Sequence, residues 1–286
     1  MTDLTPQIKT KKQSKVNTVV VTHSSPIMDN TARDFCEMME IPFVALSKNR
    51  TSPLIYKDSE RGIEVKVTRH TGHFLASIYD WDIIVLVASK MQQILNQGTD
   101  IPPRTMVIPR HELLKGLGKH DGKKEEKDLK ASLARLKMTG IETTIRNKDY
   151  RYDGGFGFLD SWGYTERKDI KEIEITLSKW LYDGICSKGA LLKVSSEYFN
   201  ITSGIKRFLY RTARKHVGVD NKPWEFSIEK LYAKSGSERE MRSFKSDLKA
   251  AVLANELPDY EMTWINRNKH SFIAFKKRKS TPILEE

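Results

Sequence analysis

The stretch "SEREMRSFKSDLKAA", residues 237–251, has the hydrophobic spacing of a helix that packs on a core. Ser237 is followed three positions later by Glu240, a capping box that predicts a helix beginning at Ser237. At about 100° per residue, the apolar residues form one stripe: Met241, Phe244, Leu248, Ala251 and Val252. The sequence therefore predicts one amphipathic helix.

The opposite face of this helix is basic. Its members are cationic or short: Arg239, Arg242, Ser243, Ser246 and Ala250, with Lys245 and Lys249 on a flank. Helical spacing brings no acid onto this face. Such a face is either a solvated surface or a binding site for a polyanion, and the rest of the sequence is needed to choose between these two interpretations.

The composition favours a polyanion as partner. The 286 residues suffice for two domains, and the formal net charge is +12, with a pI near 9.5. Residues 104–151 contain 13 Lys and Arg against 7 Asp and Glu, and residues 201–286 contain 18 against 11. There is no run of 18 apolar residues and no secretory leader, so we expect a cytoplasmic protein.

The elements around residues 237–251 predict a helix-turn-helix followed by a hairpin. Gly204–Gly218 reads as a helix, and Ser227 caps a short helix over residues 228–236. After the basic helix, residues 257–265 and 271–277 read as strands joined by the turn Asn266–His270. This order is that of a winged helix.

The same order occurs earlier in the chain. The predicted elements are a helix over Tyr79–Gly98, a strand over Thr105–Ile108, a short helix from Pro109, a long helix over residues 122–140 capped by Asp121, and strands over residues 141–147, 156–164 and 173–177. A further hairpin is expected between residues 63–70 and 73–79. The plan is repeated, although the residues are not.

We therefore expect an α+β fold with two tandem winged-helix (helix-turn-helix) domains joined by a short helical connector. The expected divisions are a flexible basic N-terminal arm over residues 1–40, an N-terminal winged-helix domain over 41–190, a connector over 191–203 and a C-terminal winged-helix domain over 204–286.

This arrangement suits double-stranded DNA, whose major groove accepts one α-helix. In the second domain the predicted contacts come from the helix and the turn: Ser237, Arg239, Arg242, Ser243, Lys245, Ser246, Lys249, Asn266, Arg267, Asn268 and Lys269. The arginines suit guanine, and the lysines suit phosphate.

The first domain offers a weaker version of the same surface. Its predicted contacts are Lys123, Lys124, Lys127, Lys130, Arg146, Lys148 and Arg151. The acids Glu125, Glu126 and Asp128 leave a salt-bridged solvent surface equally open for this helix.

The sequence contains no recognisable catalytic set. "GLGKHDGKK" lacks the first glycine and the final Ser or Thr of a phosphate-binding loop. The simplest interpretation of Asp80 and Asp82 is that they interact with the N-terminus of the helix that begins there. Cys36 and Cys186 lack the spacing of metal ligands. We expect no cofactor, no metal and no enzymatic activity.

Three segments together resemble the replication initiator protein A family of bacterial plasmids: "YDWDIIVLVASKMQ", "IPRHELLKGLGKHDGKKEEKDLKASLARLKMTGIETTI" and "GIKRFLYRTARKHVG". The resemblance implies an initiator that binds repeated origin sites, helps to open the duplex, and recruits the host initiator ATPase and the replicative helicase. It also implies a homodimer formed through the N-terminal domain. The alternatives are a winged-helix transcription regulator and a nucleic-acid enzyme such as a nuclease.

Overall fold

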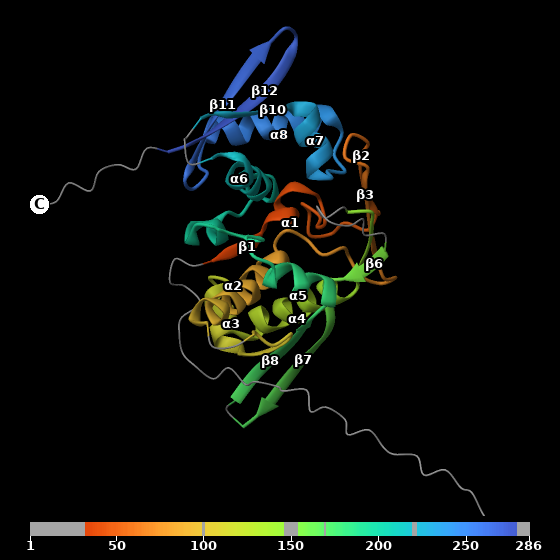
Figure 1. Cartoon of the computed structure of the whole chain (residues 1–286), viewed down its shortest axis with the longest axis vertical. Coiled ribbons are helices and arrows are strands. Elements are labelled where there is room, and N and C mark those ends of the chain that lie inside the picture. The colour runs from red at the N-terminus through yellow and green to blue at the C-terminus, as the bar shows by residue number, and fades with distance from the viewer. Residues whose placement is uncertain (1–31, 99–100, 146–153, 169, 219–221, 279–286) are drawn as a thin grey trace, which may run out of the picture.

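The computed structural model describes residues 32–98, 101–145, 154–168, 170–218 and 222–278. Its mixed helices and sheets confirm the α+β class. Two parts follow one another along the chain, the N-terminal half (residues 32–193) and the C-terminal half (residues 204–278). In Figure 1 the C-terminal half lies in the upper part of the view, and most of the N-terminal half lies in the lower part.

The N-terminal half contains three helices on a three-stranded sheet. These elements are α2 (Trp81–Gln97), β4 (Thr105–Pro109), α3 (Arg110–Gly116), α4 (Lys123–Lys137), β7 (Leu159–Arg167) and β8 (Ile170–Leu177). The strand order is β4-β8-β7, so the last strand lies in the middle. Leu129, Leu133 and Leu136 of α4 are buried at their predicted spacing.

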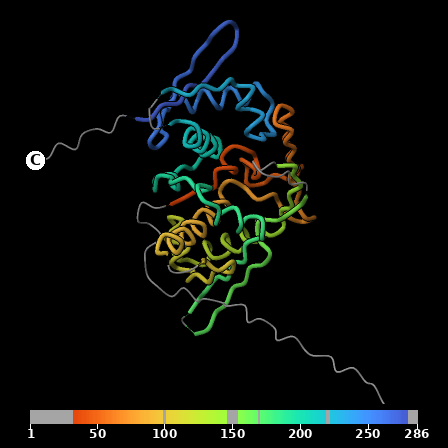
Figure 2. Tube along the Cα trace, in the orientation of Figure 1, coloured from red at the N-terminus to blue at the C-terminus, as the bar shows by residue number. Residues whose placement is uncertain are grey.

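The C-terminal half repeats this order. Its elements are α6 (Gly204–His216), β10 (Trp224–Ser227), α7 (Ile228–Ser235), α8 (Met241–Ala254), β11 (Tyr260–Arg267) and β12 (His270–Lys277). The sheet order is β10-β12-β11, again with the last strand in the middle. The hairpins β7–β8 and β11–β12 project from opposite ends of the molecule (Figures 1 and 2).

The remaining elements belong to the N-terminal half and to its link with α6. They are β1 (Arg33–Phe35), α1 (Cys36–Glu40), β2 (Leu54–Asp58), β3 (Ile63–Arg69), β5 (Thr139–Thr143), β6 (Gly154–Gly157), α5 (Lys179–Cys186), β9 (Leu191–Lys193) and the 3-10 helix η1 (Ser196–Asn200). Strands β2, β3, β5 and β6 form a four-stranded sheet in that order, and β1 pairs with β9. The stretch expected to be a connector, residues 191–203, thus contains β9 and η1.

Two predictions about the early chain are wrong. The predicted hairpin between residues 63–70 and 73–79 does not form, because β3 pairs with the preceding β2 and with β5. The predicted arm over residues 1–40 also ends too late. Residues 33–40 form β1 and α1, and Phe35, Met38 and Met39 are buried in the core. Residues 1–31 lie outside the described ranges.

The predicted pairing of the segments beginning at residues 141 and 156 is confirmed by β5 and β6, but this pair is not the hairpin that projects from the N-terminal half. Residues 156–164 do not form one strand, because the chain passes from one sheet to the other at the buried Phe158. Strand β6 pairs with β5, whereas β7 pairs with β8. The projecting tip therefore lies near Arg167 and Lys168. Arg146, Lys148 and Arg151, which were assigned to the predicted turn, lie outside the described residues.

Both long helices begin later than their predicted caps. The Ser237 hydroxyl accepts from the Arg239 amide at 3.2 Å, and α8 begins only at Met241. Gly236, at φ 59°, ends α7 in the left-handed region, so residues 237–240 form the turn between the helices. Asp121 does not cap α4 but pairs with Arg110 at 2.7 Å.

Buried ion pairs connect the two halves. Asp82 of α2 accepts from Arg207 of α6 at 2.5 and 2.6 Å, and Asp34 of β1 accepts from Arg211 at 2.6 Å. All four side chains are less than one-tenth exposed. The expected partnership of Asp82 with its own helix terminus is therefore replaced by a contact with the other half.

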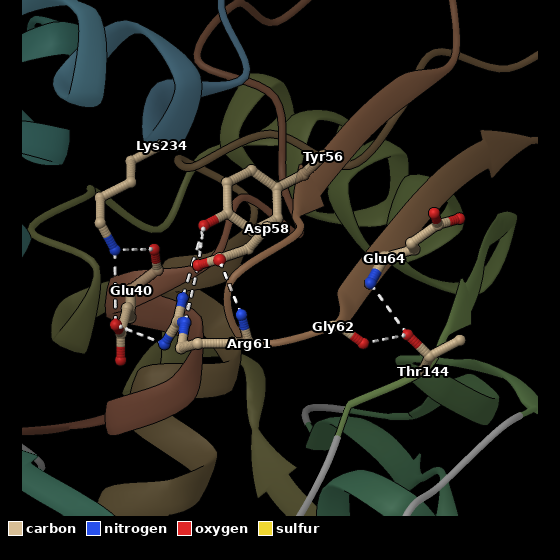
Figure 3. Close-up of polar contacts among 8 residues, drawn as sticks. All are labelled: Glu40, Tyr56, Asp58, Arg61, Gly62, Glu64, Thr144 and Lys234. Atoms are coloured by element: carbon tan, nitrogen blue, oxygen red, sulfur yellow. Dashed lines mark hydrogen bonds and ion pairs between the residues drawn. The ribbon is translucent and has the colours of Figure 1, made fainter.

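A second polar cluster connects α7 to the N-terminal half (Figure 3). Lys234 of α7 donates to the backbone oxygen and the carboxylate of Glu40 at 3.3 and 3.4 Å. Arg61 donates to Glu40 at 2.8 Å and to Asp58 at 2.7 Å. Together with the buried pairs, this cluster gives the halves several charged contacts.

Candidate nucleic-acid interface

Helix α8 exposes one narrow stripe and buries the opposite one. Phe244 and Leu248 are fully buried. The exposed stripe contains Arg242, Ser246, Lys249 and Leu253, with Ala250 and the half-buried Ser243 beside it. The small serines leave space near the helix axis, which a helix needs to enter the major groove.

Arg242 and Arg239 differ in their surroundings. Arg242 is exposed and, within the described residues, forms no ion pair. Arg239 lies in the turn before α8, and its Nε is 3.2 Å from the Asp247 carboxylate. Its side chain is still 60% exposed. The sequence-based expectation of a face without acids is therefore wrong at Arg239, because the turn folds back beside the second turn of α8.

Lys245 and Lys249 lie over the hairpin. Their Nζ atoms are 6.0 and 5.4 Å from the centre of the Trp264 ring on β11. The Trp264 Nε1 donates to Asn266 at 3.0 Å, which holds the ring against the strand. Two basic side chains of the helix therefore lie beside the hairpin.

The predicted turn residues Asn266–Lys269 divide into two groups. Asn266 accepts from Trp264 and Ser271, and Arg267 donates to Glu225 at 2.7 and 2.8 Å. Asn268 and Lys269 occupy the tip, with φ of 46° and 66°, and both are exposed. Only this second pair is presented without a side-chain partner among the described residues.

Helix α4 presents a more heavily paired surface. Lys123, Lys124 and Lys127 are exposed. Lys130 donates to Glu126 at 2.7 Å, and its Nζ lies 3.7 Å from the centre of the Tyr164 ring. The hydrogen bond from Lys130 lowers the pKa of Glu126, which also accepts from Arg110. The sequence left open that this helix carries a salt-bridged solvent surface, and the structure shows such a surface at Lys130.

The hairpin tip of the N-terminal half supplies basic residues that the sequence analysis missed. Arg167 and Lys168 are exposed at the end of β7, and Lys168 has a φ of 51°. The available signal was "TERKDIKEI", a charged turn between two alternating segments. The glycine-containing stretch "KDYRYDGG" competed with it as the predicted turn.

The described residues contain no group of three or more His, Cys, Asp or Glu side chains suited to a metal ion. No described helix has both the length and the apolar character needed to cross a bilayer.

Comparison with solved structures identifies a two-domain structure of similar fold. The chain is similar to domains 2 and 3 of RctB, with a TM-score of 0.61 at 14% sequence identity. The match covers 85% of this chain and 98% of that one. This similarity concerns the fold.

The sequence identifies the family. The chain belongs to the Replication initiator protein A family, whose profile matches residues 33–262. A protein of Wigglesworthia glossinidia brevipalpis named "Putative replication protein" is 33% identical over 273 residues, which are 94% of this chain and 96% of that protein. The resemblance expected from the three sequence segments is thereby confirmed.

Proposed function

We propose that this initiator binds repeated double-stranded DNA sites in a plasmid origin through two winged-helix domains. The repeated order of helix, strand, helix, helix and hairpin supports this proposal, because a winged helix has that order. We assign the domains to the N-terminal half, residues 32–193, and the C-terminal half, residues 204–278, with residues 194–203 between them.

One observation carries the proposal: α8 presents Arg242, Ser246 and Lys249 on one exposed stripe beside a basic hairpin. In the major groove, Arg242 has the reach and the planar fork to donate two hydrogen bonds to guanine. Lys269 at the hairpin tip has the charge and the exposure to bind a phosphate.

Helix α4 contributes mainly phosphate contacts in this proposal. Lys123, Lys124 and Lys127 neutralise backbone charge in a way that depends little on sequence. Arg167 and Lys168 extend the same surface along the hairpin of the N-terminal half. The C-terminal half therefore supplies most of the base preference.

The remaining steps of initiation are part of the proposal and rest on family membership. Bound at its repeats in the cytoplasm, the chain helps to open the adjacent duplex and recruits the host initiator ATPase and the replicative helicase. It carries out no catalysis itself and forms a homodimer through the N-terminal domain.

Selection of bound fragments from random and plasmid DNA tests the proposal. We expect enrichment of a direct repeat, and we expect a plasmid that lacks this gene to replicate when the protein is supplied in trans. Enrichment of no sequence over random DNA would refute specific binding. A recovered repeat without replication in trans would instead favour a transcription regulator.

A further inference from the structure

The turn before α8 is held by a loop of the N-terminal half. Arg50 donates from Nη1 to the backbone oxygen of Gly236, the residue that ends α7. Its other nitrogens donate to the backbone oxygens of Ser52 at 3.0 Å and Pro53 at 2.7 Å. The Arg50 side chain is only 8% exposed. One guanidinium thus joins its own loop to the turn of the other half.

Neighbouring contacts reinforce this link. The Ser52 hydroxyl donates to Glu238, two residues beyond Gly236. A Cβ atom at Gly236 would lie 2.9 Å from Leu54 Cδ1 and 3.1 Å from Pro42 Cβ, so the turn approaches the N-terminal half closely. Lys234, on the last turn of α7, binds Glu40 from another side (Figure 3).

The rest of this junction is loosely filled. A cavity of about 500 Å³ lies beside Arg50, between the loop and the start of α8. Its lining includes Ser47 from the N-terminal half, and Lys206, Ser237 and Asp247 from the C-terminal half. The polar contacts of Arg50 and Ser52 therefore position the turn together with the close packing of Gly236 on Leu54 and Pro42.

We propose that Arg50 is a positioning residue for base recognition: it orients Arg239 and the first turn of α8 toward DNA without touching DNA itself. This inference rests on the proposed DNA-binding function. The path is short, because Gly236 and Arg239 are separated by two residues and Tyr232 of α7 donates to the Arg239 backbone oxygen at 2.8 Å. The N-terminal half thereby influences which bases the C-terminal half prefers.

The test compares Arg50→Ala with Arg69→Ala in the full chain. Arg69 donates to the Thr51 backbone oxygen at 2.9 Å and so contacts the same loop from β3, without reaching the turn. Amide hydrogen exchange without DNA measures the order of residues 236–240. Titrations with a selected binding site and with random DNA measure base preference.

For Arg50→Ala we expect faster exchange at residues 236–240 and a roughly tenfold loss of affinity for the selected site, with random DNA bound within about twofold of the original affinity. Arg50→Lys should recover only part of this loss, because one ammonium cannot span three carbonyl groups. Arg69→Ala should leave the exchange and the preference within about twofold.

Ser52→Ala guards against a simple folding defect. The Ser52 side chain is exposed and its hydroxyl contacts only Glu238 across the junction, so this variant should shift exchange and preference in the same direction by a smaller factor. Unchanged exchange in Arg50→Ala, or faster exchange with unchanged preference, would overturn the inference. A lack of preference in the unsubstituted chain would instead refute the proposed function.

Discussion

Helices α4 and α8 occupy the same place in two copies of one topology, yet their exposed surfaces differ. The second residue of each helix is basic, Lys124 in α4 and Arg242 in α8. In both halves a lysine also covers an aromatic ring of the hairpin, Lys130 over Tyr164 and Lys249 over Trp264. The shared contact fixes the helix against its hairpin.

The difference lies in the remaining charges. Glu126 of α4 binds both Arg110 and Lys130, so that part of the surface is neutralised. Arg242 has no such partner among the described residues. Under the proposed function, one scaffold would therefore serve two tasks, because lysines suffice to neutralise phosphate charge whereas base readout requires a planar donor such as Arg242.

The largest expected effect concerns the buried ion pair between Arg207 and Asp82, which joins the half that contains α4 to the half that contains α8. Arg207→Met leaves the Asp82 carboxylate buried without its partner, and we expect it to lower the free energy of unfolding by about 3–5 kcal/mol. Urea denaturation measures this change. Lys206→Met is the matched control, because its exposed pair with Glu256 contributes about 0–1 kcal/mol. Similar stabilities for both variants would contradict a joined pair of halves.

The second prediction tests the difference between the equivalent residues Lys124 and Arg242. Arg242→Ala should cost about 1–3 kcal/mol of binding free energy at the selected site and relax the preference at one base pair. Lys124→Ala should weaken selected and random DNA equally. Titration against sites with single base-pair changes measures both effects. Equal losses on all sequences for both variants would remove the proposed division of tasks.

The sequence predicted those features that depend on local spacing. The apolar spacing of Leu129, Leu133 and Leu136, and of Phe244 and Leu248, correctly identified the buried faces of α4 and α8. The repeated order of elements followed from such local patterns.

Local spacing could not predict contacts between residues that are far apart in the sequence. Asp82 and Arg207 are 125 positions apart, and nothing in the local pattern pairs them. The pairing of β7 with β8 likewise depends on which sheet receives the chain after Phe158. The predicted capping box failed because Gly236 ends α7 in a left-handed conformation, which commits Ser237 to the turn.

A third prediction separates the lysines of α4. Lys127→Ala should lower affinity on the order of fivefold at 0.1 M salt for every sequence, and reduce the slope of log affinity against log salt by about one. Lys130→Ala should have a smaller effect on this slope, because its ammonium is already bound to Glu126. Salt titrations on random DNA measure both values. A larger change in slope for Lys130→Ala would contradict the paired surface described for α4.

The smallest expected effect concerns Glu40, which anchors α7 and hence the turn before α8. Burial alone would raise the pKa of Glu40, but the charges of Lys234 and Arg61 outweigh it and hold the pKa below its ordinary value of 4.5. A lowered carboxyl pKa stabilises the fold above the unfolded-state pKa, and this contribution disappears as the pH falls through the folded-state value.

Glu40→Gln should therefore lower the free energy of unfolding at pH 7 by about 0.5 kcal/mol, measured by urea denaturation, with the difference shrinking below pH 4.5. Glu64→Gln is the control, because the exposed pair of Glu64 with Lys57 should contribute little at any pH. A difference for Glu40→Gln that persists unchanged into acid would mean that the side chain stabilises α7 by packing rather than by charge. The polar attachment of the turn before α8 to the N-terminal half would then rest on Arg50 and Ser52.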